Sequence, residues 1–71
     1  MEKGWEDPVS KAMREAQSAA FKVHEGDENY VRLNPQISYI RRIQHEIAND
    51  HRLSSTSEGS EPYRRVTISK R

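Results

Sequence analysis

The apolar residues of this 71-residue chain follow one spacing up to Gly26 and another in the segment directly after it, and this change is the sequence feature that most restricts the possible folds. From residue 9 to 23 they recur at i, i+3, i+4 and i+7, the period of an amphipathic helix. Asp7 as N-cap, Pro8 at the first helical position and Gly26 beyond the end bound this helix at about 8–25. Its apolar stripe comprises Val9, Ala12, Met13, Ala16, Ala20 and Val23, and Trp5 is expected over the same face one turn upstream.

After Gly26 the apolar residues alternate, which is the period of a half-buried strand. In NYVRLNP, Val31 and Leu33 lie on one side, and Asn34-Pro35 ends the strand. The segment YRRVTISK alternates in the same way and predicts the last strand. Its inward side chains are Val66 and Ile68, and its outward ones are Arg65, Thr67 and Ser69.

A second helix lies between these strands, with Ile40, Ile43 and Ile47 as its buried seam. The serine-rich segment 54–60 fits either a disordered linker or an ordered strand and turn, and the strand beyond it favours the ordered form. The order α-β-α-β-β predicts a small α+β fold in a single domain, residues 1–71. Three strands form one sheet, and both helices pack on one of its faces.

Composition limits what such a domain can be. With 32% hydrophobic residues in 71 positions the core is small, and the absence of cysteine excludes disulfides and cysteine-ligated zinc. No apolar run approaches the roughly 18 residues of a membrane span, and the N-terminal segment lacks the apolar stretch of a secretory signal. We therefore expect a soluble, cytoplasmic protein that does not bind membranes.

The charge is distributed unevenly along the chain. Residues 1–40 carry five Lys/Arg against seven Asp/Glu, a net charge of −2, whereas residues 41–71 carry seven against four, a net charge of +3. An excess of this size suits a polyanionic partner, and it is also common on an ordinary solvated surface.

The basic residues of the second helix share one face. At about 100° per residue, Arg41, His45 and Arg52 cluster within roughly 40° of each other, opposite the isoleucine seam. Arg42 and Asn49 flank this stripe. Arg42 could also form a simple i, i+4 pair with Glu46, and His24 and His51 have an ordinary explanation at helix ends.

Two motifs give these residues a resemblance to a known family. Arg41 and His45 form an Arg-x-x-x-His pair on a helix, and Ser57-x-Gly59 is followed by Arg64 at the head of the last strand. This pattern resembles the R-3-H domain, a single-stranded nucleic-acid-binding family, over residues 30–71. The helix at 8–25 is similar to one that precedes the motif in some members. The resemblance implies a three-stranded antiparallel sheet with two helices on one side.

A narrower resemblance joins WEDPVSKAMREA, LNPQISYIRRIQHEI and EPYRRVTI to the C-terminal segment of cyanobacterial and plastid P-loop ATPases. The chain has no Gly-x-x-x-x-Gly-Lys-Ser/Thr motif, so it cannot hold a nucleoside triphosphate in that way. The resemblance implies a module appended to a larger parent protein, or a stand-alone relative of one.

The chemistry of these side chains suits phosphate. Arginine offers a fork of donors that matches phosphate oxygens, and a glycine lets backbone amides approach an anion closely. Tyr63 is a candidate for stacking on a base, although a tyrosine entering a strand is commonly half-buried. The predicted nucleic-acid-binding set is Arg41, Arg42, His45, Arg52, Ser57, Gly59, Arg64, Arg65 and Lys70, with Arg71 extending the track.

We therefore expect a module that holds the phosphate backbone of single-stranded DNA or RNA with little sequence specificity. The alternative is a docking or oligomerisation module that uses the same basic stripe, or the open sheet face, against an acidic protein. We expect no cofactor, no metal and no enzymatic activity, because Glu46 and Asp50 lie away from His45 on the helix and complete no catalytic set.

Overall fold

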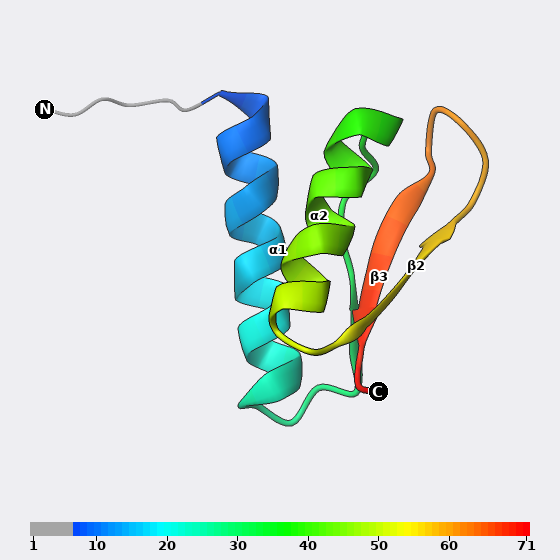
Figure 1. The fold of residues 1–71 in the computed structure, drawn as a ribbon. Helices are drawn as coiled ribbons and strands as arrows, with labels where there is room; N and C mark the ends of the chain where they lie inside the picture. The colour runs from blue at the N-terminus through cyan, green and yellow to red at the C-terminus, as the bar shows by residue number, and fades with distance from the viewer. Residues whose placement is uncertain (1–6) are drawn as a thin grey trace, which may run out of the picture.

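The computed structural model describes residues 7–71, and Trp5 lies outside them. The elements follow the predicted order α-β-α-β-β, and the predicted α+β fold class is confirmed (Figure 1). The helices are α1 (Pro8–His24) and α2 (Ser38–Asp50), and the strands are β1 (Tyr30–Arg32), β2 (Ser54–Glu58) and β3 (Arg65–Ser69). No helix of residues 7–71 is both long and apolar enough to cross a membrane.

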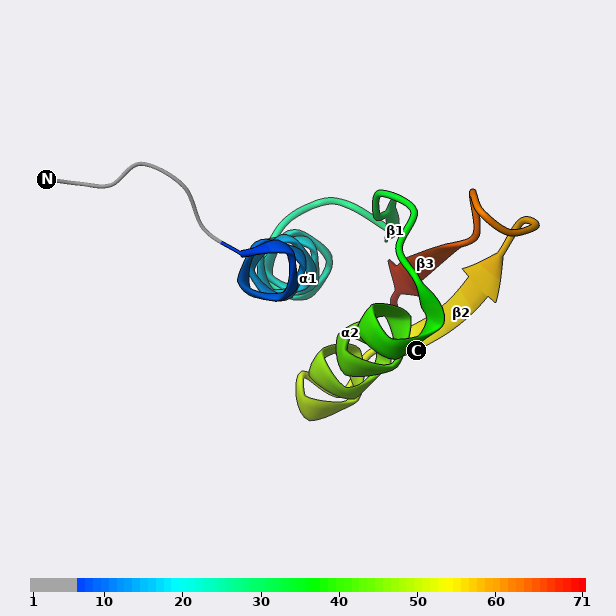
Figure 2. The ribbon, with the colours of Figure 1, turned by 90° about the horizontal axis from the view of Figure 1, so that it is seen from above.

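The three strands form one antiparallel sheet in the order β1-β3-β2, so the last strand of the chain is the central one. Val31 of β1 and Ser55 of β2 both lie opposite Ile68 of β3. Both helices pack on the same face of the sheet, as Figure 2 shows from above. The other face carries no helix within the described residues. The segment 54–60 forms β2 and the start of a turn, in agreement with the ordered alternative.

The predicted caps of α1 are present. The Asp7 carboxylate accepts a hydrogen bond from the Ser10 backbone N–H at 2.8 Å, and Pro8 is the first helical residue. At the other end the Gly26 N–H donates to the Lys22 carbonyl. A Cβ at Gly26 would lie 2.7 Å from that carbonyl oxygen, so the close approach requires glycine.

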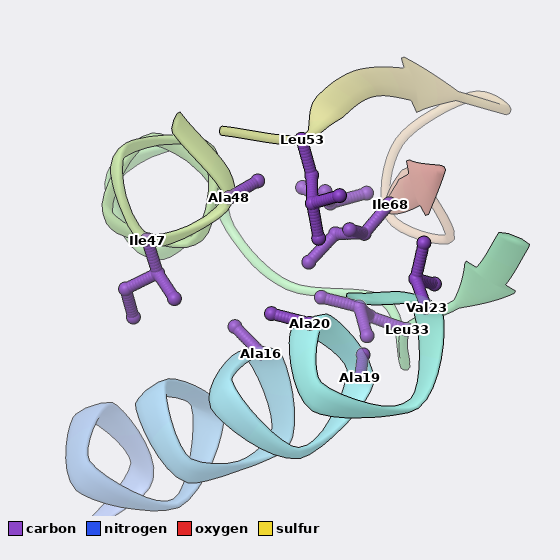
Figure 3. Packing of buried hydrophobic residues seen from close by; sticks show 10 residues of the cluster. Ala16, Ala19, Ala20, Val23, Leu33, Ile47, Ala48, Leu53 and Ile68 are labelled. Atoms are coloured by element: carbon purple, nitrogen blue, oxygen red, sulfur yellow. The ribbon is translucent and has the colours of Figure 1, made fainter. Parts of the chain in front are cut away.

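The core between the helices and the sheet is rich in alanine, which brings α1 close to α2 and β3. Val66 and Ile68 of β3 are fully buried against it, as their alternation predicted. The cluster also buries Ala19, which the predicted stripe omitted (Figure 3). It comprises Ala16, Ala19, Ala20, Val23, Leu33, Ile47, Ala48, Leu53, Val66 and Ile68.

The buried face of α2 differs from the predicted isoleucine seam. Ile43 is only half-buried, whereas Gln44 is fully buried and its Nε2 donates to the Ala12 carbonyl at 3.2 Å. The face is centred near Gln44, so it reaches round to Arg41. The expectation that Arg41 lies opposite the buried seam is therefore wrong.

The predicted position of Arg52 on the face of α2 is also wrong, because the helix ends at Asp50. Arg52 has a φ of 61°, in the left-handed region. Its N–H donates to the Asn49 carbonyl, and the Leu53 N–H donates to the Ala48 carbonyl. This pair of bonds is a Schellman motif, which turns the chain away from the helix axis before β2.

Candidate nucleic-acid interface

A hollow of about 360 Å³ lies beside α2 and the neighbouring strand β2, and we call it the α2–β2 hollow. It brings together four residues of the predicted binding set, Arg41, Arg42, His45 and Ser57. Its full lining is Ser38, Arg41, Arg42, His45, Glu46, Asn49 and Ser57.

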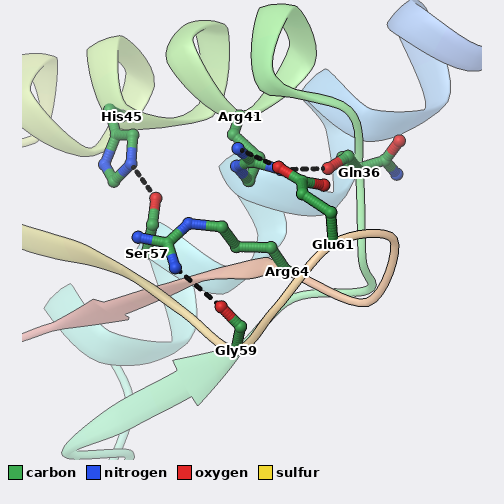
Figure 4. A network of polar contacts seen from close by, with 7 residues as sticks. All are labelled: Gln36, Arg41, His45, Ser57, Gly59, Glu61 and Arg64. Carbon is green, nitrogen blue, oxygen red and sulfur yellow. Dashed lines mark hydrogen bonds and ion pairs between the residues drawn. The ribbon is translucent and has the colours of Figure 1, made fainter.

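His45 bridges α2 to β2 through both of its ring nitrogens. Its Nδ1 lies 2.6 Å from the Ser55 hydroxyl oxygen, and its Nε2 lies 2.8 Å from that of Ser57. Ser55 and Ser57 are two residues apart on one strand, so both side chains face the helices. Figure 4 shows the ring pointing from α2 toward Ser57. Burial, and then the positive charge of Arg41, lower the pKa of His45 below its ordinary value.

Arg41 is buried, with 8% of its surface exposed, and its guanidinium is already engaged. Nη1 donates to the Gln36 carbonyl at 2.7 Å, and the two terminal nitrogens lie 3.3 and 2.9 Å from the two carboxylate oxygens of Glu61 (Figure 4). Glu61 belongs to the turn between β2 and β3 and is exposed. Arg41 therefore joins the start of α2 to this turn.

Arg42 is the arginine of the hollow that remains available. It is exposed, and no hydrogen bond or ion pair holds its side chain among residues 7–71. The i, i+4 ion pair with Glu46 is not formed, although both residues line the hollow. A phosphate in the hollow would meet the Arg42 guanidinium without displacing a protein partner.

The Ser-x-Gly and Arg elements of the motif meet at the end of β2. Gly59 has a φ of 91°, a conformation that favours glycine. Its carbonyl accepts a hydrogen bond of 2.6 Å from Nη1 of Arg64, whose side chain runs back toward Ser57 (Figure 4). Arg64 thus stabilises the turn, and it is not among the residues that line the α2–β2 hollow.

Other members of the predicted set lie elsewhere. Arg65 faces the sheet side without helices, because it alternates with the buried Val66. Arg52 follows the end of α2, and the Lys70 N–H pairs with the Asn29 carbonyl beyond β3. Arg71 does reach α2, where its Nη2 donates to the Asn49 side chain at 3.0 Å. Tyr63 is 71% exposed, so the half-buried alternative is wrong.

Sequence reasoning missed two residues that shape the site, Ser55 and Glu61. Ser55 could have been found, because it shares the strand face of Ser57. The role of Glu61 could not be predicted from the sequence pattern, because its partner Arg41 is 20 residues away along the chain. Within residues 7–71 no group of three or more His, Asp or Glu side chains is placed to hold a metal ion.

Comparison with known proteins covers most of the chain. The model of the R-3-H domain family matches residues 11–70. A curated relative, "Uncharacterized protein ycf45" of Porphyra purpurea, is 34% identical over 58 residues, which are 82% of this chain and 10% of that protein. The chain thus spans about a tenth of that relative's length. No solved structure matches it significantly.

Proposed function

This chain belongs to the R-3-H domain family, whose members generally bind nucleic acid, and we propose that it binds the phosphate backbone of single-stranded DNA or RNA. The observation that carries the proposal is the α2–β2 hollow, where the unpartnered Arg42 faces the same space as His45 and Ser57. Guanidinium, imidazole and hydroxyl groups are all donors to phosphate oxygens.

Three residues that line the hollow, Arg41, Arg42 and Ser57, have distinct roles in this proposal. Arg42 supplies the charge-assisted contact with phosphate, and the Ser57 hydroxyl supplies a neutral donor. Arg41 does not present its donors to the ligand, because Glu61 and Gln36 occupy them. It positions the turn that carries Arg64. Because these contacts are made to phosphate and not to base edges, we expect little sequence specificity.

A salt titration tests the proposal against the docking alternative. Each phosphate neutralised on a single strand contributes about −0.7 to the slope of log K against log salt, so three to five contacts give roughly −2 to −3.5. Arg42→Gln should weaken binding and make the slope less steep by about one contact. Lys11→Gln removes the same charge from the exposed side of α1 and serves as the control. A flat salt response, or equal affinity for an acidic polypeptide, would favour docking.

The role of His45 is tested by pH at constant salt. Both ring nitrogens are held by Ser55 and Ser57, so an imidazolium would act through its charge and through Ser57: its Nε2–H donates to the Ser57 oxygen and leaves that hydroxyl free to donate to phosphate. In that case binding raises the low pKa of the free ring and takes up a proton. Affinity for a 5′-phosphorylated single strand should then rise as the pH falls from about 8 to about 6. His45→Gln should abolish this dependence. An identical pH profile in both proteins would remove the cationic role from His45.

A further inference from the structure

The sheet side without helices has a hollow of its own, of about 390 Å³, which we call the outer hollow. It is lined by Arg32 of β1, Glu58 and Gly59 at the end of β2, Tyr63 of the turn and Arg65 of β3. These residues meet because the register places Glu58 opposite Arg65, while Arg32 lies opposite Thr67 on the same face.

Neither arginine of the outer hollow has a strong polar partner, although Arg32 also lies over the Tyr30 ring, with its guanidinium carbon 5.3 Å from the ring centroid. The Arg65 side chain has no hydrogen-bond or ion-pair partner among residues 7–71. Arg32 lies 3.7 Å from the Glu58 carboxylate, and both side chains are about half exposed. An exposed pair at that distance is weak and is easily exchanged for another anion. Two guanidinium groups against one carboxylate leave the outer hollow with a net positive charge.

A second observation about this face of the sheet is a buried polar group without a hydrogen-bond partner. Thr67 is 8% exposed, and its hydroxyl oxygen is buried without a hydrogen-bond partner. It lies on the face of the arginines, two residues from Arg65 and opposite Arg32. Buried hydroxyls are usually satisfied. The Thr67 hydroxyl is therefore a donor and acceptor on this face that the described residues leave unsatisfied.

The two hollows lie on opposite sides of the same edge strand. Ser57 faces the α2–β2 hollow, and the next two residues, Glu58 and Gly59, line the outer hollow. Gly59 has no side chain, so at this position no side chain separates the two hollows. Arg64, bound to the Gly59 carbonyl, lies where a chain would cross.

We propose that the outer hollow is a second subsite for the same single-stranded nucleic acid, whose backbone passes over the protein chain at Gly59, directly after β2. Arg65 and Arg32 hold a backbone phosphate there, and the exposed Tyr63 ring stacks on the adjoining base. Glu58 opposes the phosphate and releases Arg32 when the strand binds. This inference rests on the proposed function of the α2–β2 hollow and extends it.

The test compares a dinucleotide, which is too short for both hollows, with an octanucleotide, by fluorescence anisotropy. Arg65→Gln should weaken octanucleotide binding about five-fold or more, with a smaller loss for the dinucleotide, and reduce the salt slope by about 0.7. Glu58→Gln should change affinity in the opposite direction and tighten the octanucleotide complex. Lys11→Gln is the charge-matched control. Equal losses in Arg65→Gln and Lys11→Gln, or no gain in Glu58→Gln, would overturn the proposal.

A second pair of variants isolates the stacking contact. Tyr63→Ala should lose about five-fold or more in octanucleotide affinity, whereas Tyr63→Phe, which keeps the ring, should retain it. Equal affinity of these two variants would remove Tyr63 from the subsite. If the unmodified protein binds neither oligonucleotide, both proposals fail. If Arg42→Gln weakens both complexes and Arg65→Gln weakens neither, only the outer subsite fails.

Discussion

Arg41 and Arg42 are neighbours in the sequence with opposite environments, and they give the sharpest test at the scale of single residues. Arg41→Ala removes three charge-assisted hydrogen bonds from a buried position, and the exposed Glu61 can return to water. We expect a loss of about 2 kcal/mol in the free energy of unfolding. Arg42→Ala should change it by less than about 0.5 kcal/mol. Urea denaturation of both variants checks this, and equal midpoints would contradict it.

His45 links stability to pH. Its folded-state pKa lies below the ordinary 6.5 because the ring is partly buried and Arg41 is near. As the pH falls through 6.5, the unfolded chain takes up a proton that the folded chain does not. The stability contributed by the neutral ring is thus complete above 6.5 and is lost as the pH falls through the lower folded-state pKa.

We expect unfolding midpoints to decline as the pH falls below the ordinary histidine pKa of about 6.5 and His45→Gln to flatten this part of the profile. Parallel profiles for the two proteins would assign the decline to other groups.

The identity of several site residues was easier to predict from the sequence than the direction in which their side chains point. Arg41 and His45 were identified from their helical spacing, and Ser57 and Arg64 from the resemblance to the Ser-x-Gly and Arg signature of the R-3-H domain family. The burial of Arg41 was not predictable from the isoleucines alone, because Gln44 and Ala48 also face inward and rotate the buried face. Its partner Glu61 depends on how the turn folds back, which no periodic pattern encodes.

At the scale of elements, the end of α2 carries avoidable strain. Arg52 adopts a left-handed conformation that costs an L-residue about 1 to 2 kcal/mol and glycine almost nothing. Glycine also raises the conformational entropy of the unfolded chain, which lowers the free energy of unfolding by about 0.4 to 1 kcal/mol. Arg52→Gly should therefore stabilise the protein by about 0.5 to 1 kcal/mol in thermal unfolding. Arg52→Ala removes the charge and keeps the strain, so a similar gain in that variant would refute the explanation.

The elements themselves were largely predictable, because α1 has clear caps and β3 alternates cleanly. Strand order was not, since alternation shows which side chains are buried and not which strands are neighbours. The serine-rich β2 lacked an apolar pattern, because its helix-facing residues Ser55 and Ser57 bind His45 where other strands contribute aliphatic side chains.

For the whole molecule, stability rests on a small core centred on β3. Ile68 is fully buried and Ile43 is half-buried at the edge of the same cluster. Ile68→Ala should cost about 2 to 5 kcal/mol, which a domain of this size hardly tolerates. Ile43→Ala should cost about 1 to 2 kcal/mol. Circular dichroism with urea measures both, and a larger loss for Ile43→Ala would contradict this description of the core.

The central position of β3 also governs when the domain can form during synthesis. The ribosome releases α1, β1, α2 and β2 first, and none of the strands among them pairs with another. Until Arg65–Ser69 emerges from the exit tunnel, the nascent chain therefore contains two helices and two unpaired strand segments, which are prone to aggregation. Folding of the domain therefore waits for β3 to emerge, and a stalled chain that lacks β3 would be a substrate for chaperones and proteases.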